Sequence, residues 1–165
     1  MLKKLYEKFI NPKRIVVIVD DDLSIVEIYK DIVIDIKIDL IEFKIFDDAL
    51  KCFEYIKDNY RNIISLISDE KMPVLTGGEL CEQVKKLNPA ISTIVITAYD
   101  SEKLYMSYKN AGGYVDKVLS KLGIEKGIIE EINRVRRIIK KMLYESLPIK
   151  KQKTMLPLKL RGAMQ

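Results

Sequence analysis

Apolar residues fall in short runs that predict buried strands. "IVVIV" (15–19), "NIISLIS" (62–68) and "STIVITA" (92–98) are mostly β-branched and lack clean polar alternation. Such runs are typical of strands that are covered on both faces of a parallel sheet. "IEFKIF" (41–46) alternates more and predicts a strand nearer an edge, and "GYV" (113–115) predicts a short fifth strand.

Helical patterns separate these runs, over residues 24–35, 47–59, 78–87, 101–111 and 125–146. In the first of them, isoleucines recur every three or four residues: Ile25, Ile28, Ile32 and Ile36. Strands and helices therefore alternate five times, which predicts an α/β fold. We expect a doubly wound five-stranded parallel sheet with helices on both faces and an extended last helix.

The charge is distributed very unevenly. Residues 132–165 carry ten Lys/Arg and one acid, and residues 1–14 carry five bases and one acid, so the total of +5 leaves −8 for residues 15–131. We expect a basic N-terminal extension (1–13), one domain (14–146) and a flexible basic tail (147–165).

The last helix keeps apolar residues beyond Arg137, namely Ile138, Ile139, Met142 and Leu143. We expect this part to contact a second molecule, either a copy of the chain or its target. The alternative is a longer surface helix followed by a solvated tail.

Composition excludes several classes of site. The chain has no histidine and only two cysteines, Cys52 and Cys81, which excludes a Cys/His zinc site and gives no sign of a disulfide framework. The basic start is followed by no signal-peptide cleavage site, and no apolar run is long enough to cross a membrane. We therefore expect a cytoplasmic protein with reduced thiols.

Polar residues with matching chemistry stand at the predicted strand ends. Asp20 and Asp21 follow the first strand, Asp69 ends the third, Thr97 lies near the end of the fourth, and Lys117 follows the fifth. Ligands of doubly wound sheets bind beyond the carboxyl ends of the strands, so we expect all five residues on one rim.

This set of residues suits phosphoryl transfer. Three carboxylates form an oxygen-rich site of the kind that binds Mg²⁺, and a carboxylate can act as a nucleophile that becomes an aspartyl phosphate. Mg²⁺, the Lys117 ammonium and the Thr97 hydroxyl can each neutralise one phosphoryl oxygen. Each residue alone has a simpler interpretation: the aspartates as helix caps, Thr97 as an ordinary strand residue and Lys117 as a surface lysine.

Four motifs occur in the order and at the strand ends of a known family. They are "VIVDDD", "SDEKMPVLTGGEL" (which fits D-x-x-M-P-x-x-x-G), "VITA" and "AGGYVDK". With them, residues 14–146 resemble the receiver domain of two-component response regulators, a flavodoxin-like fold. The likeness is to stand-alone, chemotaxis-regulator-like receivers.

The resemblance implies a role for each residue. Asp69 would be the phosphoacceptor, and Asp21, Asp69 and the backbone carbonyl of Lys71 would bind Mg²⁺ directly, with Asp20 acting mainly through water. Thr97 and Lys117 would hold the phosphoryl oxygens.

The implied switch residues are Thr97 and Tyr114, which precedes Lys117 by three positions and would swing inward as Thr97 moves toward the phosphate. Two departures from the family stand out: Val118 replaces the proline that usually follows the lysine, and the stretch between Thr97 and Lys117 is a little short.

The implied function is a phosphorelay signalling switch and not an enzyme in the usual sense. Its partners would be a sensor histidine kinase or phosphotransfer protein and a target bound by the fourth helix, fifth strand and fifth helix. A homodimer through the last helix is possible in addition, and we expect no membrane contact and no nucleic-acid partner.

Three alternatives differ in class. One is a transcription-type or nucleic-acid-associated regulator acting through the basic tail, although too few residues follow the last helix for a helix-turn-helix domain. Another is a phosphate-independent interaction scaffold. A metal-dependent phosphatase is disfavoured, because Lys71 stands where the D-x-D pattern of such enzymes has its second acid.

Overall fold

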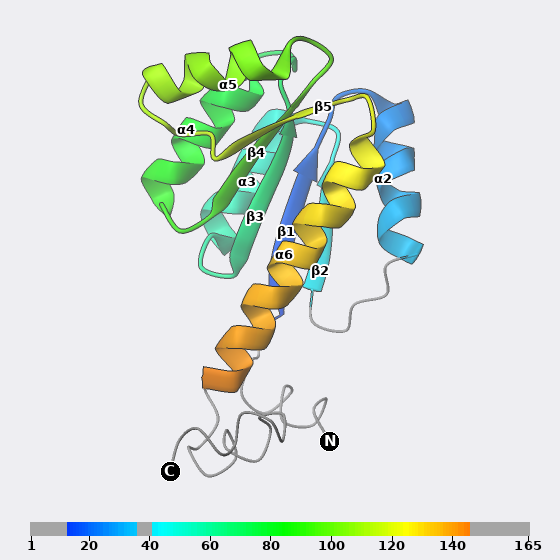
Figure 1. The fold of residues 1–165 in the computed structure, drawn as a ribbon, viewed down its shortest axis with the longest axis vertical. Helices are drawn as coiled ribbons and strands as arrows, with labels where there is room; N and C mark the ends of the chain where they lie inside the picture. Colours follow the sequence, from blue (N-terminus) through cyan, green and yellow to red (C-terminus); the bar gives the residue numbers. More distant parts are fainter. Residues whose placement is uncertain (1–12, 36–40, 146–165) are drawn as a thin grey trace, which may run out of the picture.

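The computed structural model describes residues 13–35 and 41–145. A five-stranded, all-parallel sheet with the order β2-β1-β3-β4-β5 forms its centre (Figure 1). The strands are β1 (Arg14–Val19), β2 (Ile41–Phe46), β3 (Ile63–Asp69), β4 (Ser92–Thr97) and β5 (Lys117–Ser120). The helices are α2 (Leu23–Asp35), α3 (Ala49–Asn59), α4 (Gly77–Leu87), α5 (Ser101–Asn110) and α6 (Ile124–Glu145). The predicted fold class is confirmed.

Helices cover both faces of the sheet because the strand side chains alternate between two cores. Val17, Leu66 and Val95 pack with α3 and α4 on one face. Val16, Ile67 and Ile96 pack with α2 and α6 on the other. The inner strands are therefore apolar at almost every position, as strands buried on both faces must be.

The core-facing side of helix α2 matches the predicted isoleucine stripe only in part. Val26 and Tyr29 are buried, Ile25 and Ile32 pack partly buried against the same core, and Ile28 is exposed. Ile36 lies outside the described residues. A buried tyrosine in this stripe has a consequence for the acidic site, because its hydroxyl has to find a partner there.

The fifth strand was predicted at the wrong place. It runs over Lys117–Ser120 and not over 113–115. Gly112 and Gly113 adopt φ of 127° and 71°, so they form the turn that leaves α5 and not the start of a strand. Asp116 N then donates to Thr93 O (2.9 Å), and pairing with β4 begins one residue later.

Helix α6 keeps its apolar stripe inside its own domain. Ile128, Ile132, Val135 and Ile139 are all buried against the sheet. The expectation that Ile139 contacts a second molecule is therefore wrong, while Ile138 and Met142 are half-buried. Most of the N-terminal extension and the tail, residues 1–12 and 146–165, lie outside the described part of the chain. Within that part, no helix combines the length and apolarity that a membrane crossing requires.

The loop between β3 and α4 contains a strained residue. Val74 has a φ of 70° and is 83% exposed, and Leu75 N donates to Pro73 O (2.8 Å) across it. A γ-turn with positive φ is rare and strained, and the cost is greatest for a β-branched residue.

Val74→Asn should therefore raise the free energy of unfolding by about 1 kcal/mol, because asparagine tolerates positive φ and no burial is lost. Urea unfolding followed by circular dichroism measures the change. Leu122→Asn is the matched control, since Leu122 is 92% exposed but does not have a positive φ. Equal effects of the two substitutions would show that the gain comes from surface polarity and not from relief of strain.

Candidate functional site

Three aspartates meet at the carboxyl end of the sheet. Asp20 follows β1 and is 0% exposed, and Asp69 ends the neighbouring strand β3 and is 4% exposed. Asp21 is exposed beside them. One carboxylate oxygen from each lies within 4.8 Å of the others. This part of the predicted site is therefore brought together as expected, and its all-oxygen donor set fits Mg²⁺.

The lysine at this site is Lys121. Its Nζ lies 2.6 Å from Asp69 Oδ1 and 3.4 Å from Asp20 Oδ2. It follows Ser120, the last residue of β5, which pairs with Thr97 of β4. The end of the fifth strand therefore places the ammonium at the rim, as the sequence analysis expected for Lys117.

Lys117 does not lie at the acidic cluster. It begins β5 opposite Ile94, three residues before the Thr97–Ser120 pair, which is about 10 Å back along the strand. Its Nζ lies 3.6 Å from Glu130 of α6. The prediction failed because the strand begins at Lys117 and does not end before it.

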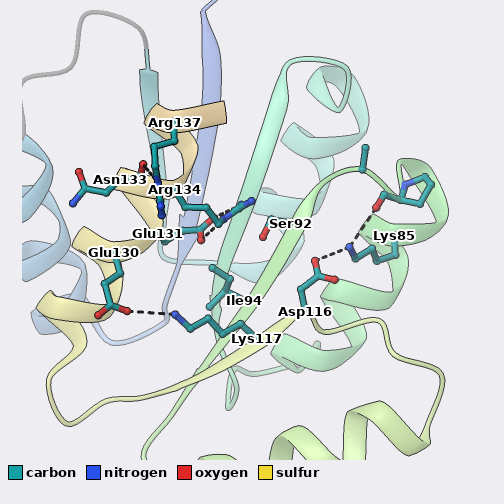
Figure 2. A pocket seen from close by; sticks show the side chains of 12 residues that line it. Lys85, Ser92, Ile94, Asp116, Lys117, Glu130, Glu131, Asn133, Arg134 and Arg137 are labelled. Carbon is teal, nitrogen blue, oxygen red and sulfur yellow. Dashed lines mark hydrogen bonds and ion pairs between the residues drawn. The ribbon is translucent and has the colours of Figure 1, made fainter. Parts of the chain in front are cut away.

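Lys117 instead lines a pocket of about 720 Å³ beside α6 (Figure 2). The charged groups there pair with one another: Lys117 with Glu130, Arg134 with Glu131, and Lys85 with Asp116. Glu131 also accepts a hydrogen bond from Ser65 Oγ (2.9 Å) within the core. This pocket lies between α6 and the strands β4 and β5, and it is remote from the aspartates.

Thr97 lies at the predicted rim, together with Lys71, which follows Asp69, and Tyr99, which follows Thr97. Thr97 is buried at the end of β4, and its Oγ1 accepts a hydrogen bond from Tyr99 N (3.0 Å). Lys71 N donates to Asp69 Oδ2 (2.9 Å). Lys71 Nζ donates to Tyr99 Oη (2.6 Å) and lies 4.3 Å from the ring centroid. A Lys71–Tyr99 bridge thus joins the loop after Asp69 to the loop after Thr97.

Tyr114 lies at the other end of the fifth strand. It precedes β5, and its carbonyl accepts a hydrogen bond from Thr93 Oγ1 (2.7 Å) near the start of β4. The position three residues before Lys121 is Val118, which packs partly buried against the core. Tyr114 is thus separated from Thr97 by the length of the strand, and this geometry does not support the switch role that the resemblance implied for it.

A tyrosine of α5 reaches the residue next to Asp69. Tyr108 Oη donates a short hydrogen bond to Glu70 Oε2. The Tyr108 ring packs so closely on α4 that a Cβ at Gly78 would lie 2.3 Å from it. Burial raises the pKa of the Glu70 carboxyl, although hydrogen bonds from Tyr108 and Gly78 oppose the shift. No α5 side chain is fully buried, and Tyr108 gives this helix a hydrogen bond to the loop.

Burial determines the electrostatics of the acidic cluster. It raises the pKa of Asp20, with a smaller contribution from the charge of Asp69, while the Asp22 backbone and Lys121 oppose the shift. Burial also disfavours the charged form of Lys121, but contacts with Asp69 and Asp20 outweigh it and raise its pKa. The site therefore holds ionised groups that depend on one another.

Sequence reasoning missed Lys121, Tyr29 and the Glu70–Tyr108 contact. Two signals pointed to Lys121: "KVLS" contains two apolar residues, as "GYV" does, and placing the lysine after it removes the apparent shortness of the stretch from Thr97. Tyr29 gives no such signal, because its stripe on α2 looks like any apolar helical face.

Residues 16–133 match the family model described as the response regulator receiver domain. A search of curated proteins gives no match. Among solved structures, a CheY-like receiver domain protein from Methanospirillum hungatei is 26% identical, with a TM-score of 0.64, and the match covers 79% of this chain and 98% of that one.

Two further structures agree in fold. A receiver domain protein from Clostridium thermocellum is 21% identical (TM-score 0.60; 76% of this chain, 98% of that one). The CheX–CheY–BeF₃–Mg complex from Borrelia burgdorferi contains a chain 20% identical (TM-score 0.62; 74% and 88%). Since the family model covers well over half of the chain and the acidic pocket is present, this chain belongs to the response regulator receiver domain family.

Proposed function

We propose that the chain is a Mg²⁺-dependent phosphoacceptor switch, in which Asp69 takes a phosphoryl group from a phosphohistidine of a sensor kinase or phosphotransfer protein. The observation that carries this proposal is the position of Asp69, which is buried at a strand end with Lys121 Nζ 2.6 Å from one carboxylate oxygen and two further aspartates beside it. The reaction serves regulation, so the chain is not proposed as an enzyme in the usual sense.

The transfer requires an in-line attack by one oxygen of Asp69 on phosphorus. A P–O bond forms while the P–N bond to the partner's imidazole breaks, and the departing nitrogen keeps the electron pair. Lys121 would neutralise one phosphoryl oxygen, and the Thr97 hydroxyl would donate to another. Lys121 takes the role that the sequence suggested for Lys117, because of these two lysines it is Lys121 that reaches Asp69, while Lys117 pairs with Glu130.

Asp20, Asp21, Asp69 and the backbone carbonyl of Lys71 would hold the Mg²⁺. When bound, the ion supplies positive charge to the phosphoryl oxygens. The oxygens of the three carboxylates are close enough to share one hard cation. The cation would also relieve the repulsion that ionised Asp20 and Asp69 exert on each other in the buried site.

The output surface in this proposal is formed by α5, β5 and α6. Thr97 is the switch residue, and Tyr114 is replaced in that role by a contact on α5. The Glu70–Tyr108 hydrogen bond ties α5 to the residue after Asp69, so movement of the loop around Asp69 would reach α5 directly. The chain would act in the cytoplasm, where partners of this family occur.

The basic tail, residues 147–165, lies outside the described ranges. A nucleic-acid contact through it was the alternative function, and no observation here tests it. Self-association through the last helix also stays a prediction, and it would have to use residues other than Ile139, which is buried.

Acetyl phosphate with Mg²⁺ should add one phosphoryl group, seen by intact mass, and Asp69→Asn should remove it because an amide is not a competent nucleophile. Lys121→Ala should slow the labelling at least about tenfold, since one of the charges on the phosphoryl oxygens is lost. Lys117→Ala is the matched control and should label like the wild type. An unlabelled wild-type chain would favour the phosphate-independent interaction scaffold. Slow labelling of Lys117→Ala together with normal labelling of Lys121→Ala would return the phosphate-binding role to Lys117.

Asp20→Asn should raise the melting temperature at pH 7 without divalent cations. The pKa of Asp20 is higher in the folded state than the usual value of 3.8. The folded protein is therefore destabilised as the pH rises from 3.8 through the folded-state pKa, and this destabilisation is fully present above that pKa. The difference between variant and wild type should therefore shrink as the pH falls toward 4. Calorimetry at several pH values measures it.

The matched control for this experiment is Asp22→Asn. Hydrogen bonds from Ser24 lower the pKa of Asp22, so its ionised form stabilises the fold and the variant should melt lower. An Asp20→Asn variant that also melts lower at pH 7 would mean that Asp20 acts mainly as a hydrogen-bond acceptor.

Tyr108→Phe should weaken the coupling between Asp69 and α5. With Mg²⁺ and beryllofluoride, NMR signals of α5 should shift in the wild type but shift less in the variant, while those around Thr97 shift equally in both. Tyr105→Phe, on the same helix and partly buried, is the control. If the α5 signals shift as much in Tyr108→Phe as in the wild type, another contact carries the coupling.

A further inference from the structure

Asp20 has a partner that comes from the helix behind it. Tyr29 of α2 is 1% exposed and lies in the core between α2, α6 and the sheet. Its hydroxyl donates to Asp20 Oδ2 (3.2 Å). This contact is buried, and it joins the hydrophobic core directly to the acidic cluster.

The two oxygens of Asp20 have separate partners. Oδ1 accepts from Asp22 N (3.1 Å), while Oδ2 is shared by Tyr29 Oη (3.2 Å) and Lys121 Nζ (3.4 Å). Lys121 lies closer to Asp69, at 2.6 Å. The Asp22 and Tyr29 contacts both come from the chain segment that follows Asp20, and together they hold one oxygen of the carboxylate each.

The three partners would not all persist through the proposed reaction. A phosphoryl group on Asp69 would engage Lys121 and draw it from Asp20, to which it is the more weakly attached. Tyr29 would then be the only side chain left on Oδ2 among those in contact with it here. Burial and the charge of Asp20 raise the pKa of Tyr29, so it stays neutral and remains a donor across the working pH range.

We infer that Tyr29 is a positioning residue for the metal site: it fixes the orientation of the Asp20 carboxylate by holding Oδ2, so that the acidic cluster is arranged for a divalent cation before the cation binds. This inference rests on the proposed function, because it assumes that the cluster binds Mg²⁺. Donors behind a metal-binding carboxylate orient it and raise its affinity for the ion.

The simpler alternative is that the hydroxyl of Tyr29 only satisfies its own need for a partner. In that case removal of the hydroxyl would change stability and not metal binding. The two readings differ in whether the effect of Tyr29 passes through Asp20.

Binding of Mn²⁺ alone, a spin-active substitute for Mg²⁺ at oxygen sites, tests the inference by electron paramagnetic resonance of the free ion, with Mg²⁺ as the competitor. Tyr29→Phe keeps the ring and its packing and removes the hydroxyl, and it should weaken Mn²⁺ binding about tenfold. Tyr60→Phe is the matched control, because it removes the hydroxyl of a partly buried tyrosine at the C-terminal end of α3. It should bind Mn²⁺ like the wild type.

A double-mutant cycle shows whether Tyr29 acts through Asp20. In an Asp20→Asn background, Tyr29→Phe should have no further effect on Mn²⁺ affinity. The inference is overturned if Tyr29→Phe binds within about twofold of the wild type, or if it loses as much affinity in the Asp20→Asn background. Thermal melting of each variant without metal accounts for any fraction that is unfolded.

Failure of this inference and failure of the proposed function give different results. If the wild type is labelled by acetyl phosphate and binds Mn²⁺, but Tyr29→Phe binds equally well, only the role of Tyr29 is wrong. A wild type that binds no Mn²⁺ contradicts the magnesium site itself and overturns both. Weaker Mg²⁺ binding should also slow the labelling of Tyr29→Phe, and high Mg²⁺ should restore it. A variant that stays unlabelled at high Mg²⁺ would contradict a role limited to orienting Asp20.

Discussion

The negative charge of Asp20 and Asp69 is the constraint on which the rest of the site depends. Each carboxylate is buried, and burial of an ion without compensation costs several kcal/mol. Lys121 supplies the counter-charge, and the backbone N–H groups of Asp22 and Lys71 bond the remaining oxygens. A cation or phosphoryl group that binds here must therefore replace or join an existing partner, which links occupancy of the site to the loops that carry those partners.

The sheet topology brings these charges together. The order β2-β1-β3-β4-β5 makes β1 and β3 neighbours, so Asp20 and Asp69 leave adjacent strands at the same edge. Crossing to both sides of β1 opens the crevice in which ligands of such folds bind. The short strand β5 then ends opposite Thr97, and Lys121 follows it directly.

Two buried polar contacts hold the layer of α2 and α6 to the sheet. Tyr29 brings a hydroxyl to Asp20 at the carboxyl end of the sheet. Farther along, Glu131 accepts hydrogen bonds from Ser65 of β3 and from Arg134. Buried polar groups tolerate little displacement, because each lost partner costs about 1–3 kcal/mol. The two contacts therefore fix both helices against the sheet, and α6 in turn fixes the end of the loop that carries Lys121.

The sequence by itself determined the fold class, four of the five strands, the approximate span of every helix and the meeting of Asp20, Asp21, Asp69 and Thr97 at one rim. These follow from local rules, since strand and helix periodicities are read from neighbouring residues and parallel strands end on one side. Only the tertiary structure decided between Lys117 and Lys121, because the choice depends on where β5 pairs with β4 after two glycines of positive φ. It also decided which face of α2 is buried and so gave Tyr29 its partner: several apolar faces of that helix are similar, and packing against the sheet selects one.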